Sequence, residues 1–118
     1  MLKLSEEIKL YVLSKPVDMR KSIDGLTFLV TDMMTVSPQS NSLFIFYNKA
    51  KDKVKAIYWH KNGFVLLYKR LESGRFKIKC SLEQTYAEIN SHQLDWLLAG
   101  LDYELMQQFP DLNYACYA

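Results

Sequence analysis

The sequence predicts an α+β domain: a mainly antiparallel, five- to six-stranded sheet built as a hairpin meander, with one helix packed on a face and a C-terminal helix. Three observations predict this class. Turn-forming dipeptides separate runs of aromatic and β-branched residues in the middle of the chain. An amphipathic stretch with helical spacing follows the first apolar run of the chain, and a leucine stripe follows the last one.

Segment 54–76 holds the hairpin signals. Asn62-Gly63 lies between two β-rich runs and supplies the positive φ angles of a type I′ turn, so we predict a two-residue loop there. Ser73-Gly74 offers a second turn of the same kind, which predicts three consecutive antiparallel strands.

This register would place three cations in a row across the three strands, with Lys55 opposite Arg70 and Arg70 opposite Lys77. Like charges directly opposite one another destabilise a sheet. Two interpretations are open: an anion occupies the row, or the side chains spread into water and are screened by salt.

The remaining elements of the first half follow in order. Segment 8–13 alternates and is rich in β-formers, which predicts a first strand. Asp18 suits a helix N-cap, and apolar residues at helical spacing predict a helix over 19–34. Segment 43–47 reads as a buried strand, and 48–53 turns it into the next strand.

The second half ends in helical signals. Segment 86–89 is a short strand candidate, and Asn90 or Ser91 then caps a helix whose stop is Gly100. A further short helix is expected over 101–109. We expect one domain over 1–118, with the tail 103–118 loosely packed.

Composition excludes several classes. The chain is 49% apolar and 14% aromatic, which argues against disorder. Its first residues are charged and do not resemble a signal peptide, and no apolar run approaches the roughly 20 residues of a membrane helix. Cys80 and Cys116 lack metal or redox spacing, so reduced thiols in a cytoplasmic protein are expected.

Charge is segregated along the chain. Segment 48–79 carries ten cations and two acids, whereas six acids and no Lys or Arg follow Cys80. A basic middle predicts a sheet face that attracts a polyanion. The acidic end would contact a basic partner or fold back on the sheet.

Arg20 and Lys21 fall in the predicted first helical turn, where exposed N–H groups already favour an anion. They would form a phosphate site, or Arg20 would pair with Asp18 or Asp24 and hold the loop. Lysines also crowd the turn before Val54. The aromatic residues among these cations would either stack on bases or build the core (Tyr58, Trp59, Phe64, Tyr68 and Phe76).

Catalytic chemistry is not indicated. His60 and His92 lack a second ligand at metal-binding spacing, and neither a Gly-rich phosphate loop nor a nucleophile elbow occurs. A magnesium nuclease would have to use aspartates such as Asp18, Asp24 and Asp32, of which the first reads as a cap. We therefore expect no enzyme activity, no metal and no cofactor.

Five sequence words occur in an order that is typical of one family: 16–26 (PVDMRKSIDGL), 43–48 (LFIFYN), 58–64 (YWHKNGF), 68–76 (YKRLESGRF) and 94–102 (LDWLLAGLD). Over residues 8–102 the chain resembles the small accessory protein, TnpB type or Orf2-like, of insertion sequence 66 (IS 66) family transposons. It departs from the family pattern at Ser22, at Ile78-Lys79, and in having lysines where arginines are common near residue 50.

The resemblance implies a bacterial cytoplasmic protein, encoded beside a transposase, that assists transposition without strand-transfer chemistry. The charge pattern adds DNA as a partner, and the resemblance implies that this DNA is the transposon ends and that the transposase is a second partner. An adaptor that docks on the transposase without touching DNA is the alternative. The predicted nucleic-acid-binding residues are Arg20, Lys21, Lys55, Lys69, Arg70, Arg75 and Lys77.

Overall fold

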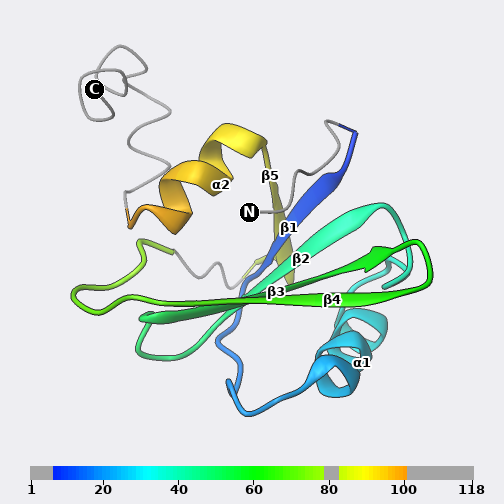
Figure 1. The fold of residues 1–118 in the computed structure, drawn as a ribbon, viewed down its shortest axis with the longest axis horizontal. Coiled ribbons are helices and arrows are strands. Elements are labelled where there is room, and N and C mark those ends of the chain that lie inside the picture. Colours follow the sequence, from blue (N-terminus) through cyan, green and yellow to red (C-terminus); the bar gives the residue numbers. More distant parts are fainter. Residues whose placement is uncertain (1–6, 79–82, 101–118) are drawn as a thin grey trace.

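The computed structural model describes residues 7–78 and 83–100 (Figure 1). These form an α+β fold, as predicted. The elements in chain order are β1 (Lys9–Leu13), α1 (Ile23–Met33), β2 (Ser42–Tyr47), β3 (Lys53–His60), β4 (Gly63–Arg70), β5 (Tyr86–Ile89) and α2 (Ser91–Leu98). Both cysteines and the predicted helix over 101–109 lie outside the described residues.

The five strands form one mixed sheet in the order β4-β3-β2-β1-β5. Three of its pairings are antiparallel, but β1 and β2 are parallel. The predicted hairpin meander is therefore wrong at this point, and no sixth strand occurs in the described ranges. The reason is α1, which follows β1 and precedes β2 in the chain. It provides the long crossover connection that parallel neighbouring strands require.

The β3–β4 hairpin is confirmed, but its loop is Lys61-Asn62 rather than Asn62-Gly63. His60 pairs with Gly63, so Lys55 lies opposite Tyr68 and not opposite Arg70. Lys61 adopts a positive φ of 55°, whereas Asn62 and Gly63, for which the prediction expected positive φ angles, do not. The displacement in pairing is two residues, so every side chain keeps its predicted face of the sheet.

The third consecutive strand is a wrong prediction, because residues 71–78 form an arm that returns to the β2–β3 turn. The backbone N–H of Phe76 donates to the carbonyl oxygen of Lys51 (2.6 Å), and the N–H of Leu71 donates to that of Asp52 (2.8 Å). Gly74 has the positive φ of 82° expected of a turn residue. The predicted row of Lys55, Arg70 and Lys77 consequently does not form.

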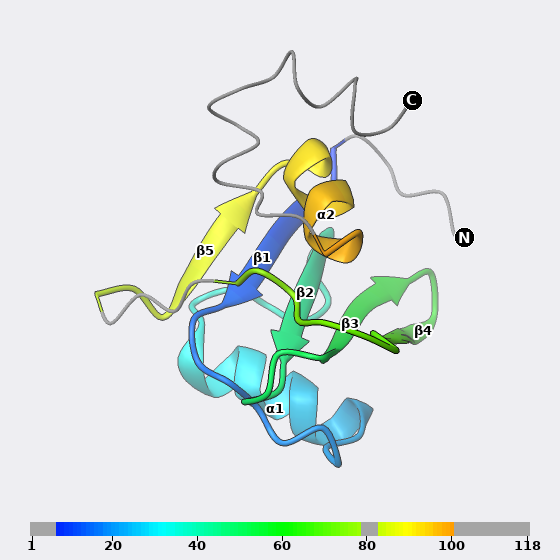
Figure 2. The same cartoon turned by 90° about the vertical axis from the view of Figure 1, so that its left-hand side faces the viewer.

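Two apolar layers cover the sheet. On one face α1 buries Leu26 and Val30 against Phe44, Phe46 and Ile57 of the central strands. On the other face lie α2 and the arm 71–78, whose buried members are Leu94, Trp96, Leu97, Phe76 and Ile78. Figure 2 shows the two helices on opposite sides of the sheet, so each face has a different cover.

Helix α2 begins as predicted. The Asn90 side chain accepts from the backbone N–H of Gln93, and the Gln93 side chain accepts from that of Asn90, which completes a capping box. Beyond the helix, Gly100 has a φ of 79° and its N–H donates to the carbonyl of Leu97. The α1 helix starts later than predicted, at Ile23, with Ser22 as its N-cap.

Candidate nucleic-acid interface

The loop before α1 is shaped by Asp18. Its carboxylate accepts from the backbone N–H of Arg20 (2.9 Å) and from the Arg20 guanidinium, with Nη2 at 2.7 Å. This side chain is therefore committed to the loop, and the prediction that it caps the helix is wrong. Arg20 and Lys21 precede α1 instead of forming its first turn.

Lys55 of β3 supports this loop from the sheet. Its ammonium donates to the carbonyl oxygens of Met19 (2.6 Å) and Lys21 (3.1 Å). It also lies 5.7 Å from the ring centroid of Tyr68, the residue opposite it in β4. Because its hydrogen-bond partners are neutral carbonyls, the positive charge of Lys55 still contributes to the potential of this surface.

The β2–β3 turn is fixed by Asn48. The Asn48 side-chain oxygen accepts from the backbone N–H groups of Asp52 (3.1 Å) and Lys53 (3.0 Å), and its Nδ2 donates to Asp52 Oδ1 (2.6 Å). These bonds leave Lys49 and Ala50 exposed at the tip of the turn. The hydrogen bond from Asn48 and the nearby Lys53 ammonium lower the pKa of Asp52.

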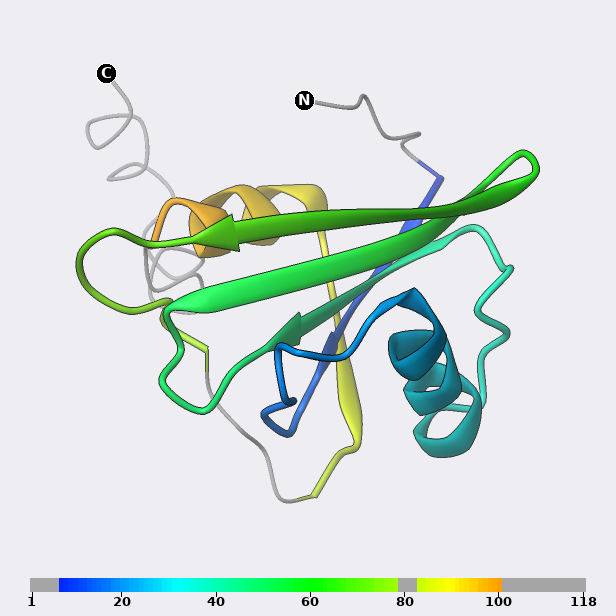
Figure 3. The ribbon, with the colours of Figure 1, turned by 60° about the horizontal axis from the view of Figure 1, so that its bottom comes forward.

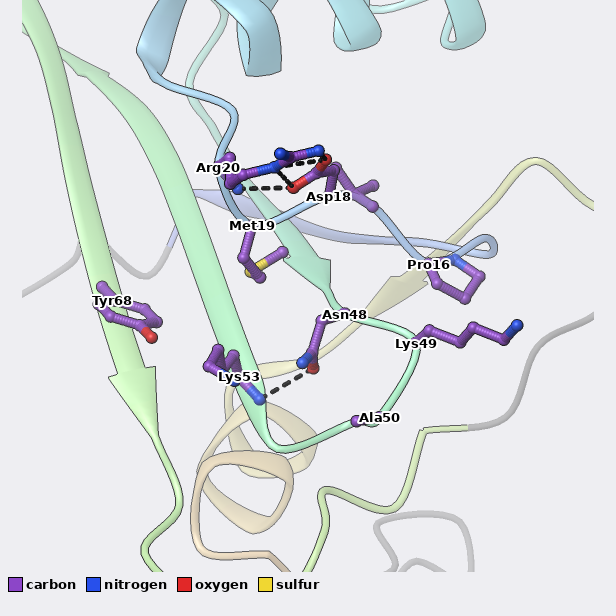
Figure 4. A pocket seen from close by; sticks show the side chains of 10 residues that line it. Pro16, Asp18, Met19, Arg20, Asn48, Lys49, Ala50, Lys53 and Tyr68 are labelled. Atoms are coloured by element: carbon purple, nitrogen blue, oxygen red, sulfur yellow. Dashed lines mark hydrogen bonds and ion pairs between the residues drawn. The ribbon is translucent and has the colours of Figure 1, made fainter.

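An open groove of about 760 Å³ lies between the loop, this turn and strand β4 (Figure 4). The Tyr68 ring borders it on the β4 side, with Arg20 across the groove and Lys53 at the end near the β2–β3 turn. Carbon-rich side chains make much of its wall and cations stand among them. The lining residues are Pro16, Val17, Asp18, Met19, Arg20, Asn48, Lys49, Ala50, Lys53 and Tyr68.

The structure brings together part of the predicted set. Arg20 lines the groove. Lys55 lies opposite Tyr68, and Arg70 lies opposite Lys53 and projects from the same face of β4 as Tyr68. Arg20, Lys55 and Arg70 are therefore grouped around the groove. Lys21 follows Arg20 in the loop. In Figure 3, which looks toward the α1 face, this loop runs in front of the central strands.

Three predicted residues lie elsewhere. Lys69 projects from the opposite face of β4, where its ammonium donates to the carbonyl of Leu98 at the end of α2 (2.6 Å). Arg75 and Lys77 are exposed on the arm and do not line the groove.

Lys49 and Lys53 were missed as site residues. The cluster of lysines in this turn was visible in the sequence. Which of them line the groove depends on the turn conformation fixed by the Asn48 hydrogen bonds, which a hydrophobic pattern does not predict.

The five aromatic residues differ in their exposure. Tyr58 and Phe76 are buried in the core. Trp59 and Phe64 pack against each other across β3 and β4, with ring centroids 5.0 Å apart. Tyr68 is 54% exposed, which leaves its ring accessible.

Arg20 and Arg70 each have a carboxylate partner as well. Arg20 pairs with Asp18 at 2.7 Å and Arg70 with Glu72 at 3.2 Å. The alternative prediction that Arg20 pairs with a neighbouring aspartate is therefore confirmed, with Asp18 as the partner. The Arg20 side chain remains 91% exposed and that of Arg70 57% exposed. Exposed pairs of this kind contribute little to stability, so a phosphate can compete for either guanidinium.

The Asp18–Arg20 pair gives a pH prediction. Hydrogen bonds from the Arg20 side chain hold the pKa of Asp18 at about 2, below its ordinary value of 3.8. A carboxylate with a depressed folded-state pKa stabilises the fold above pH 3.8, and this contribution is lost as the pH falls toward 2. In a ¹³C NMR titration, Asp18 should titrate near pH 2 in the wild type and move toward 3.8 in Arg20→Gln. Lys21→Gln is the control, since Lys21 is the smallest of the causes; an equal effect of both would contradict the assignment.

Comparison with known proteins identifies the family of this chain. The family model described as "IS66 Orf2 like protein" matches residues 8–108. The chain belongs to the IS66 Orf2-like family. The resemblance seen in the sequence words is thus confirmed, and this family points to a transposon accessory protein.

Two relatives of this IS66 Orf2-like chain come from Sinorhizobium fredii (strain NBRC 101917 / NGR234). "Uncharacterized protein y4jC" is 31% identical over 106 residues, which is 90% of each chain. "Uncharacterized protein y4hO" is 29% identical over 108 residues, covering 92% of this chain and 93% of the relative. No solved structure matches the chain.

No group of three or more His, Cys, Asp or Glu side chains in 7–78 and 83–100 is arranged to hold a metal ion. Over the same ranges, neither helix has the length and apolar character needed to cross a membrane.

Proposed function

We propose that this IS66 Orf2-like protein is a non-catalytic accessory factor of transposition that binds the DNA of the transposon ends. Its binding surface, which we call the α1-side basic surface, is formed by Arg20, Lys49, Lys53, Lys55 and Arg70. The observation that carries the proposal is the convergence of cations from three separate segments, namely the loop before α1, the β2–β3 hairpin and β4. The bacterial cytoplasm is where such a protein would meet both DNA and transposase.

Charge supports a polyanion as the ligand. The five cations are opposed locally by three carboxylates, those of Asp18, Asp52 and Glu72. The surplus is positive, and the ion pairs of Arg20 and Arg70 on this surface are exposed and exchangeable. Contacts of this kind hold phosphates without reading bases, so the binding should be largely independent of sequence.

Fluorescence anisotropy with labelled transposon-end DNA tests the proposal. We expect binding at low salt that weakens steeply as salt is added, with a log–log slope of about −0.9 for each phosphate contacted. Three to five contacts would therefore give a slope of roughly −3 to −4.5. Absence of binding to any DNA at low salt would overturn the proposal.

The adaptor role is a second candidate, favoured by a different surface. Phe28 of α1 is 65% exposed and lines, together with Phe64, a second open hollow of about 510 Å³. An exposed aromatic beside a hollow is typical of protein contacts. Capture by the element's transposase that survives nuclease treatment and is lost in Phe28→Asp would favour this role over DNA binding.

A further inference from the structure

Tyr68 stands out among the exposed side chains. An exposed aromatic residue by itself needs no explanation. Tyr68, however, is half exposed at the wall of the groove, beside the ammonium of Lys55 and two residues from Arg70. Its preceding same-face neighbours, Phe64 and Leu66, have apolar partners on the α1 side, whereas the Tyr68 ring faces the groove.

The groove combines two kinds of wall. Pro16, Val17 and Met19 supply carbon-rich surface, and Arg20 and Lys53 supply positive charge around it (Figure 4). Its volume of about 760 Å³ falls within the range of sites that hold small organic groups, roughly 300–1,000 Å³. A ligand that is only a phosphate would leave the apolar wall and the tyrosine ring unused.

A nucleotide with an unpaired base matches both kinds of wall. The flat ring of a base can stack on an aromatic side chain, and every base has such a face. Its phosphates match cations at the rim. Bases within a duplex are already stacked on their neighbours and cannot enter a groove of this kind, so a duplex could use the rim cations only.

We propose that the groove binds single-stranded DNA, with one unpaired base stacked on Tyr68 and the adjoining phosphates held by Arg20, Lys53 and Arg70. This inference rests on the DNA-binding role proposed above and specifies its substrate class. Lys55 acts here as a positioning residue, because its ammonium is bonded to the carbonyls of Met19 and Lys21 and lies beside the Tyr68 ring.

The test compares two probes of the same transposon-end sequence, an unpaired oligonucleotide and a blunt duplex, by anisotropy at several salt concentrations. The wild-type protein should prefer the single strand. Tyr68→Ala should weaken single-strand binding on the order of ten-fold, because one stacked base is lost, and change duplex binding by less than about two-fold. Tyr68→Phe should retain wild-type binding, since stacking needs the ring and not the hydroxyl.

Phe28→Ala is the matched control, because it removes an exposed aromatic ring outside this groove and should alter neither probe. A second readout is the NMR spectrum of the Tyr68 ring protons, which a stacked base shifts upfield. Duplex binding that is salt-dependent but unaffected by Tyr68→Ala, together with no preference for the single strand, would overturn this inference and leave the DNA-binding role intact. Failure of both probes to bind at low salt would overturn both this inference and the DNA-binding role.

Discussion

Replacing Arg20 and Arg70 together by glutamate should weaken DNA binding on the order of 100-fold at low salt, with roughly tenfold lost for each charge reversal. Both guanidiniums belong to the α1-side basic surface, and each reversal exchanges a phosphate attraction for a repulsion. The log–log salt slope should become shallower by about 2, one for each phosphate contact removed. Both side chains are mostly exposed, so the changes should have little effect on the free energy of unfolding.

Arg75→Glu together with Lys77→Glu is the control for this double variant. It changes the net charge of the protein by the same amount, but on the arm 71–78, outside the groove. We expect a much smaller loss of affinity from this pair. Equal losses from the two double variants would mean that overall charge, and not the convergence at the groove, determines binding.

Replacing Phe44 by alanine should lower the free energy of unfolding by about 3–5 kcal/mol. Phe44 is 1% exposed in the middle of β2, and its ring stacks on that of Tyr11 with centroids 5.8 Å apart. Its neighbours come from α1 and from two other strands, so they cannot all move into the cavity. Because domains of this size are stable by only about 5–15 kcal/mol, the variant should be close to unfolding at 37 °C.

Urea unfolding followed by far-UV circular dichroism measures this effect as a lower midpoint at an unchanged slope. Phe28→Ala again serves as control, because that side chain is 65% exposed and its loss should change stability by less than about 0.5 kcal/mol. A Phe44→Ala variant as stable as Phe28→Ala would contradict the two-layer packing described for the α1 face.

Local signals predicted the elements well. The unbroken apolar run of β2 is buried at every position, and Asn90, one of the two predicted caps, is the N-cap of α2. Each depends on neighbours within a few residues, which the sequence displays directly. Sheet order is different, because the parallel pairing of β1 with β2 is decided by where α1 packs and not by any dipeptide.

The candidate site was half predictable for a similar reason. Alternation along a strand separates Lys69 from Arg70, so these two residues could have been assigned to opposite faces from the sequence alone. The role of Asp18 could not, since one carboxylate can cap a helix or bind the backbone and guanidinium of Arg20, and the structure shows the second arrangement. The local electrostatics of a loop thus moved the start of α1 by several residues.

The strand order has a consequence for synthesis on the ribosome. Four neighbouring strands, β4 to β1, can pair once residue 70 has left the exit tunnel. Strand β5 pairs with β1 later, at the edge of the sheet opposite β4. Until residues 86–89 leave the exit tunnel, β1 is an edge strand of the nascent chain. Its residues Leu10, Val12 and Leu13 then lack the pairing strand β5. The edge at which a nascent copy is most prone to pair with another is therefore closed only when residues 86–89 have emerged and paired with β1.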